Sequence, residues 1–87
     1  MRKKVDITFL KAFGNNLKLM RESKNITQAQ LAIDCDCDVS VISRIERGVV
    51  NTSLSNLKLI SSALNIPLKE FFEFESNPTV NLQKNTL

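Results

Sequence analysis

The sequence contains no histidine, tryptophan or tyrosine, and it has only two glycines, two prolines and two cysteines among 87 residues. Histidine is the usual general base near neutral pH and the commonest metal ligand, so its absence argues against most hydrolytic and zinc chemistry. The sequence also offers no nucleophile beside a plausible base and no glycine-rich loop for a phosphate group. We therefore expect that the protein is not an enzyme and uses no cofactor.

Long hydrophobic runs are missing as well. The first residues, MRKKVDITFLKAF, begin with basic side chains, but Asp6 and Lys11 interrupt the apolar stretch, so a signal peptide is not predicted. No stretch approaches the length that spans a membrane. We expect a cytoplasmic protein with reduced cysteines, without a membrane partner and without a small-molecule substrate.

What is present favours one small helical domain. A chain of 87 residues buries a single modest core, which a partner subunit can complete. The net charge is +3, and the basic excess lies at the start: residues 1–24 carry seven basic and two acidic side chains, whereas residues 25–48 carry two and four. A balance of this size is compatible with nucleic-acid binding but does not establish it.

Apolar residues recur at three- and four-residue steps in five segments, which predicts an all-α fold of five helices. The segments are 8–24, 27–35, 38–48, 53–65 and 67–72. Thr27 and Gln30 form the T-x-x-Q pattern of a capping box, while Asp38 and Ser53 are suitable N-caps. Gly48 is suited to end the third helix.

The stretch IDCDCDVSVISRIERG, residues 33–48, alternates aspartate and cysteine and raises the question of a metal site. Asp34, Asp36 and Asp38 match the first ligands of a calcium-binding EF-hand loop. That loop needs glycine at its sixth position and glutamate at its twelfth, where this chain has Val39 and Ile45. The pattern therefore does not predict a calcium site.

The two cysteines of this stretch, Cys35 and Cys37, are the only thiols of the chain, whereas a zinc ion needs four ligands. Only a site shared between subunits could supply four, so no metal is expected. A disulfide between residues two apart would be strained, and the expected compartment is reducing. We expect both cysteines to pack as small apolar side chains, with redox sensing as the alternative.

Two short helices joined by a tight turn, with the second presented outward, describe a helix-turn-helix motif, whose second helix enters the major groove of DNA. Five apolar residues are expected to hold the two helices at a fixed angle: Leu31, Ala32, Cys37, Ile42 and Ile45. Four residues of the second helix are expected to stay exposed: Val39, Ser40, Ser43 and Arg44.

The segment TQAQLAIDCDCDVSVISRIERG resembles the helix-turn-helix of the phage repressor and Cro type, also called the XRE family. The usual family pattern is T-Q-x-x-L-A, then small or turn residues, an apolar position, and I-S-x-I-E-x-G. The resemblance extends back through FGNNLKLMRESKNI and forward through NTSLSNLKLISSALNIPLKEFF, and so covers residues 9–72. Within the family, the final KEFFEFE is similar to the controllers of restriction-modification genes.

The resemblance implies a compact five-helix domain of the lambda-repressor-like type. We place it at residues 8–74, between a basic N-terminal arm (1–7) and a C-terminal tail (75–87) that we expect to be mobile. Asp36 stands where the family usually has glycine, so it must accept an unusual backbone conformation.

The resemblance also implies roles for individual residues. The residues expected to contact bases are Val39, Ser40, Ser43 and Arg44. Of these, Arg44 is suited to a bidentate contact with guanine. Contacts with phosphates, which orient the protein without reading sequence, fall to Thr27, Gln28, Arg47 and Asn51. Arg21 and Glu46 occupy the positions of an internal ion pair that links the first and third helices of the family.

The end of the expected domain is rich in phenylalanine. A domain this small cannot easily bury every one of these rings, and exposed aromatic clusters commonly mark a protein interface. We therefore predict a homodimer built on the last helix. Its interface residues would be Leu68, Phe71, Phe72 and Phe74.

Together these features predict a sequence-specific regulator of transcription that binds double-stranded DNA as a dimer on an inverted repeat. The alternative is a protein-interaction module, similar to an antitoxin, that keeps the fold with weak or no DNA binding. The three aspartates of the turn favour this alternative, because carboxylates beside the DNA surface repel phosphates.

Overall fold

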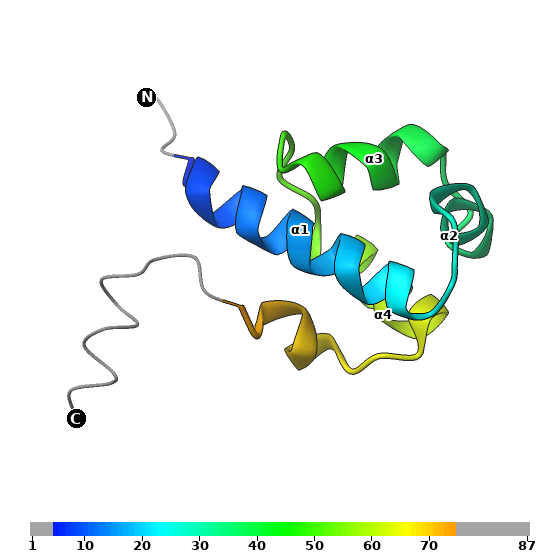
Figure 1. Ribbon diagram of the computed structural model, residues 1–87. Helices are drawn as coiled ribbons and strands as arrows, with labels where there is room; N and C mark the ends of the chain where they lie inside the picture. The colour runs from blue at the N-terminus through cyan, green and yellow to red at the C-terminus, as the bar shows by residue number, and fades with distance from the viewer. Residues whose placement is uncertain (1–4, 75–87) are drawn as a thin grey trace.

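The computed structural model describes residues 5–74, which form four α-helices and one short 3-10 helix, without a strand. The elements are α1 (Ile7–Ser23), α2 (Gln28–Asp34), α3 (Val39–Arg47), α4 (Leu54–Leu64) and the 3-10 helix η1 (Leu68–Phe72). In Figure 1, α1 runs through the middle of the molecule, with α3 on one side of it and η1 on the other. The tail predicted at 75–87 and most of the predicted arm lie outside the described residues.

Side-chain caps start three of the four α-helices. Asp6 accepts a hydrogen bond from the backbone N–H of Phe9 at 2.9 Å and so begins α1 one residue before the predicted start. Thr27 and Ser53 cap α2 and α4 in the same way. Asp38 is the N-cap of α3 by position, but its side chain makes no capping hydrogen bond to that helix.

Three residues in the left-handed region end α1, α3 and α4: Asn25, Gly48 and Asn65 have φ angles of 59°, 72° and 56°. Asparagine and glycine tolerate this conformation better than other residues. Helix boundaries therefore follow from residues adjacent to each helix, which is why the predicted and observed limits agree closely.

The fifth predicted element is a 3-10 helix rather than an α-helix, so the prediction of five α-helices is wrong at this point. The segment has five residues, too few to offset the cost of starting an α-helix. The side-chain amide of Asn16, on α1, also donates to the backbone carbonyl oxygens of Glu70 and Phe71 at 3.2 and 3.0 Å. These bonds tie η1 to α1 and occupy carbonyl groups at its end.

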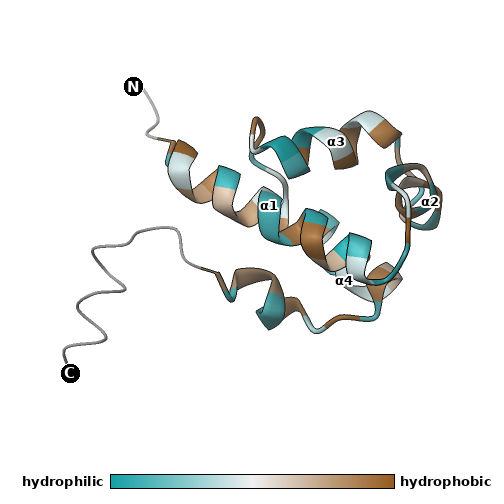
Figure 2. Ribbon diagram, viewed as in Figure 1, coloured by the Kyte–Doolittle hydropathy of each residue, from teal (hydrophilic) through white to brown (hydrophobic). Residues whose placement is uncertain are grey.

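The core takes side chains from all four α-helices and from η1, and Figure 2 shows apolar and polar residues interspersed along the helices. The largest fully buried side chains are Phe71, Leu17, Leu31, Ile42, Ile60 and Leu64. Phe71 has no exposed surface, so its predicted place in a dimer interface is wrong: the ring completes the core of its own subunit. None of the helices within residues 5–74 has the length and apolar character needed to cross a bilayer.

Helices α1 and α3 approach each other closely at Gly14. A Cβ atom added to Gly14 would lie 2.5 Å from the carbonyl oxygen of Glu46 and closer still to that of Ile45. Because α1 meets the backbone of α3 here, only glycine fits. At the end of α3, a Cβ on Gly48 would lie 2.6 Å from the Cα of Lys11. The position of α3 is thus fixed by backbone contact as well as by side chains.

Replacing Gly14 with alanine should destabilise the protein. The backbone carbonyls that the new methyl group meets cannot move without displacing α3, and overpacking of this kind costs about 1–3 kcal/mol. This cost opposes a gain of about 1 kcal/mol in helix propensity. Urea denaturation should show a net loss of stability for G14A and none for the control N15A, whose side chain is exposed on the same helix. Equal stability of G14A and the wild type would contradict the close contact.

Candidate nucleic-acid interface

The turn between α2 and α3 is built around Asp36. Cys35 caps the end of α2, Asp36 follows with a φ angle of 55°, and the N–H of Cys37 donates to the carbonyl oxygen of Ala32 at 3.0 Å. Aspartate tolerates the left-handed conformation better than most residues other than glycine, so the chain reverses here without one. The two helices are thereby joined by four residues, 35–38.

The inner side of this motif is apolar. Leu31 and Ile42 have no exposed surface, and Ala32 and Ile45 are 3% exposed. These four side chains hold α2 and α3 together and join the motif to the core. Cys37 is half-buried and packs against the same core.

The two thiols are poorly suited to reaction or metal binding. Burial raises the pKa of Cys35, and the nearby Cys37 and Asp34 raise it further. Burial also raises the pKa of Cys37, with additional contributions from Asp38 and Asp36. Since the thiolate is the nucleophile and the metal ligand, both cysteines stay in the unreactive protonated form at neutral pH. Among residues 5–74, no three acidic or thiol side chains come together to hold a metal ion.

The outward side of α3 carries the four residues predicted to read bases. Val39 is 46% exposed, Arg44 is exposed, and Ser40 and Ser43 are half-buried. Their spacing along the chain places them on one side of the helix, whereas Ile42 and Ile45 face the core. The structure therefore brings these four together on an accessible surface.

The predicted phosphate contacts lie at the ends of the motif. Thr27 and Gln28 start α2, and the Thr27 hydroxyl is occupied as the helix cap. Arg47 is exposed in the last turn of α3, where its Nε donates to the Ser43 hydroxyl at 3.3 Å. Asn51 is exposed in the connection to α4. All four side chains thus lie at the surface or partly exposed, and each carries a polar group.

A buried ion pair joins α1 to α3. Arg21 donates from Nε to Glu46 Oε2 at 2.6 Å and from its second terminal nitrogen to Oε1 at 3.0 Å, while each residue is 7% exposed. The remaining guanidinium nitrogen donates to the carbonyl oxygen of Ile26 at 2.7 Å. The hydrogen bond with Glu46 raises the pKa of Arg21, so the guanidinium stays charged. Paired and fully hydrogen-bonded, the two charges can remain buried.

One feature of this region has no signal in the sequence. The side-chain amide of Gln28 donates to Glu46 Oε1 at 2.8 Å, which links the start of α2 to the buried ion pair. The two residues are 18 positions apart, so no local pattern connects them. Gly14, by contrast, had a signal: a glycine inside a helical pattern indicates a close approach of backbones.

The three aspartates of the turn are exposed beside α3. Asp34 accepts a hydrogen bond from the Gln30 amide at 2.9 Å, which leaves the second half of the predicted capping box unformed. Asp36 and Asp38 face solvent. They add negative charge next to Val39 and Ser40, at the start of the helix predicted to enter DNA.

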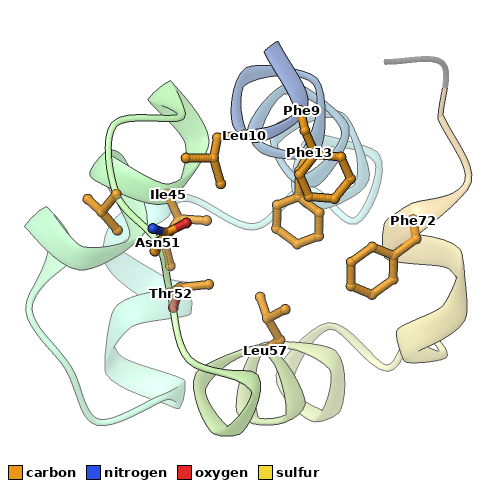
Figure 3. Close-up of a pocket in the computed structure, with 9 residues that line it drawn as sticks. Phe9, Leu10, Phe13, Ile45, Asn51, Thr52, Leu57 and Phe72 are labelled. Carbon is orange, nitrogen blue, oxygen red and sulfur yellow. The ribbon is translucent and has the colours of Figure 1, made fainter. Parts of the chain in front are cut away.

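The predicted dimer residues other than Phe71 lie near the surface. Phe72 is 44% exposed, while Leu68 and Phe74 are half-buried. Figure 3 shows Phe72 of η1, Phe13 of α1 and Leu57 of α4 around a common hollow, which has a volume of about 140 Å³. The remaining lining residues are Phe9, Leu10, Ile45, Val50, Asn51 and Thr52. An apolar hollow with an exposed aromatic ring at its edge is thus present at this end of the subunit.

Comparison with known proteins gives consistent similarities. A helix-turn-helix family profile matches residues 17–71. The chain is 43% identical over 63 residues to control protein C.BamHI of Bacillus amyloliquefaciens, covering 71% of this chain and 78% of that protein. It is 44% identical over 61 residues to control protein C.MunI of Mycoplasma sp, covering 69% and 82%. The crystal structure of the restriction-modification controller protein C.AhdI from Aeromonas hydrophila superposes with a TM-score of 0.71 at 36% identity, covering 72% of this chain and 96% of that one.

Removing one member of the buried ion pair should destabilise the fold strongly. Glu46→Leu leaves the Arg21 charge buried without its partner, which we expect to cost about 3–5 kcal/mol in urea denaturation. The double variant Arg21→Met/Glu46→Leu removes both charges and should lose clearly less than the sum of the two single losses. Additive losses would contradict direct pairing of the two side chains.

Proposed function

The chain belongs to the helix-turn-helix family, and from this premise we propose that it is a transcriptional regulator that binds double-stranded DNA in a sequence-specific manner. The family resemblance inferred from the sequence is confirmed, as is the all-helical class of the fold. The observation that best supports the proposal is the division of α3 into a buried side and an accessible side that carries Val39, Ser40, Ser43 and Arg44.

Each residue of that accessible side has a role in the proposed complex. Arg44 donates two hydrogen bonds to the O6 and N7 atoms of a guanine, and Val39 packs against a thymine methyl group. Ser40 and Ser43 are small enough to let α3 lie deep in the major groove, where their hydroxyls reach base edges. Gln28 and its neighbours at the ends of the motif hold phosphates and so set the orientation of α3.

We propose that the remaining phosphate contacts are those of Thr27, Arg47 and Asn51. Arg47 and Asn51 are exposed at the end of α3, so a DNA strand that passes there meets a guanidinium and an amide. The Thr27 hydroxyl can still donate its hydrogen, since capping uses it only as an acceptor.

We further propose that two copies associate through the end of the domain. The hollow between α1, α4 and η1 is apolar, and Phe72 and Phe9, 44% and 36% exposed, lie at it. A second copy that covers these rings would remove them from water and bring two α3 helices to successive major-groove segments, about 34 Å apart. Such a dimer requires an inverted-repeat operator. Leu68 and Phe74, both half-buried, extend the same surface.

The cellular role that we propose follows the relatives. Two of them are control proteins, and C.AhdI is a restriction-modification controller. By analogy, we assign this protein to the control of transcription, in the cytoplasm where the DNA of a prokaryotic or phage genome lies, without an enzymatic step.

A second function, that of a protein-interaction module similar to an antitoxin, is favoured by one observation. Asp34, Asp36 and Asp38 are all exposed beside α3, and their carboxylates oppose the approach of a polyanion. The two functions differ in salt dependence, because neutralising phosphates makes DNA affinity fall steeply with added salt.

Selection of bound duplexes from a random library tests the proposed function directly. A regulator should enrich an inverted repeat whose half-sites are separated by one helical turn. The absence of enrichment, together with weak binding at low salt, would favour the interaction module instead.

Arg44→Ala should relax the preference of the protein at one base position of each half-site. A bidentate contact with guanine discriminates by about 1–3 kcal/mol, so relative affinities for substituted operators should converge by up to roughly a hundredfold. Gln28→Ala should weaken binding to all duplexes similarly, because a phosphate contact carries no base information. The control Lys58→Ala removes a positive charge from α4 and should leave the preference intact. Unchanged discrimination in the Arg44 variant would reject its role as a reader.

Phe72→Glu should convert the proposed dimer to monomers, because it places a charge in an apolar contact. Sedimentation velocity at tens of micromolar measures this directly. Ile33→Glu is the matched control, since Ile33 is 70% exposed on α2, away from η1. A wild-type protein that sediments as a monomer would remove the basis of the proposed dimer.

A further inference from the structure

Gln28 differs from the other predicted phosphate contacts because its side chain is hydrogen-bonded to a buried carboxylate. It is half-buried, and its Nε2 donates to Glu46 Oε1 at 2.8 Å. That oxygen also accepts a hydrogen bond from Arg21 at 3.0 Å, so the carboxylate is fixed before Gln28 reaches it. Among residues 5–74, no buried side-chain nitrogen or oxygen lacks a partner.

The charge of Glu46 decides which way the Gln28 amide faces. A carboxylate only accepts hydrogen bonds, so the NH₂ group of Gln28 must face it and the amide oxygen must face away. The NH₂ group has two hydrogens, and the bond to Glu46 uses one of them. The second hydrogen points away from Glu46, from a side chain that is only partly buried.

We propose that Glu46, fixed by Arg21, is a positioning residue that directs the second Nε2 hydrogen of Gln28 toward a phosphate of bound DNA. This inference rests on the proposed function. Glu46 itself need not touch DNA, because it is 7% exposed and acts through Gln28. A glutamine without this restraint would lose side-chain freedom on binding, whereas Gln28 loses that freedom when the protein folds.

The hydrogen bond between Gln28 and Glu46 also fixes where the proposed phosphate contact lies relative to the residues proposed to read bases. Glu46 is on α3, two residues beyond Arg44, and Gln28 is the first residue of α2. The hydrogen bond between Gln28 and Glu46 therefore joins a phosphate contact directly to the helix that reads bases. Arg21 extends this connection to α1 and, through the carbonyl oxygen of Ile26, to the α1–α2 connection. Gln28, the proposed phosphate contact, and α3, the helix proposed to read bases, thus move as one unit.

A double-variant cycle tests whether Glu46 acts through Gln28. The affinities of the wild type, Gln28→Met, Glu46→Gln and the double variant are measured on the selected duplex, at a temperature where circular dichroism shows each protein folded. Gln28→Met keeps the length of the side chain but loses the donor. Glu46→Gln should weaken binding about two- to tenfold in the wild-type background and change it less than twofold in the Gln28→Met background. Equal losses in both backgrounds would overturn the inference.

The control for general destabilisation is Asn16→Ala, which removes the amide that holds η1 and leaves the ion pair intact. It should lower stability without changing DNA affinity by more than twofold in a folded sample. An equal loss of affinity in the control and in Glu46→Gln would mean that loosening of the fold, and not the orientation of Gln28, weakens binding.

Side-chain amide NMR of the wild-type protein provides a test that does not depend on variant stability. In a uniformly ¹⁵N-labelled sample, duplex addition should shift one of the two Gln28 side-chain amide protons and leave the other, bound to Glu46, nearly unchanged. If neither proton moves while the backbone signals of α3 do, the inference fails and the proposed function stands. If no signal moves with any duplex, the proposed function fails and the phosphate contact with it.

Discussion

The contact between α1 and α3 determines how this small domain presents its surface. At Gly14 the two helices meet with backbone against backbone, at the carbonyl groups of Ile45 and Glu46, and the carboxylate of Glu46 also accepts hydrogen bonds from two nitrogens of Arg21. The first contact permits only one separation of the helices. The second opposes rotation of α3 about its axis, because rotation would break hydrogen bonds to a buried charge. Together they determine which residues of α3 are buried and which face solvent.

A buried ion pair is weak evidence for stability, since desolvation of two charges offsets most of their attraction. Here the ion pair specifies one rotation of α3 relative to α1. An apolar pair at positions 21 and 46 could tolerate several rotations of α3, whereas the guanidinium fork and the carboxylate match in only one. A helix that reads base edges needs a fixed rotation, because each contact depends on where a side chain points. The polar contact is therefore placed where orientation matters most.

The elements that sequence could predict are those determined by neighbouring residues. Thr27 and Ser53 start helices through bonds to the third residue after them, and Gly48 and Asn65 end helices through their own backbone freedom. The elements that it could not predict depend on distant partners. Asn16 ties down the carbonyls of η1 across more than fifty residues, and Phe71 is buried because α1 and α4 leave space for its ring. The Gln28–Glu46 bond likewise exists only once α2 and α3 have packed.

The surface charges indicate why one subunit alone would be insufficient for tight binding to DNA. Asp34, Asp36 and Asp38 are exposed between the end of α2 and the start of α3, while Arg44 and Arg47 are exposed toward the end of α3, so we expect a single subunit to attract phosphate only weakly. In the proposed complex, a neutral donor such as Gln28 would add a phosphate contact without adding charge, which would suit a protein that must reject most DNA. Linking two weak sites raises affinity only where both sites engage at once. In the proposed dimer, the exposed Phe72 would provide the surface for such a link, so weak electrostatics and an apolar contact between subunits would together confine tight binding to paired half-sites.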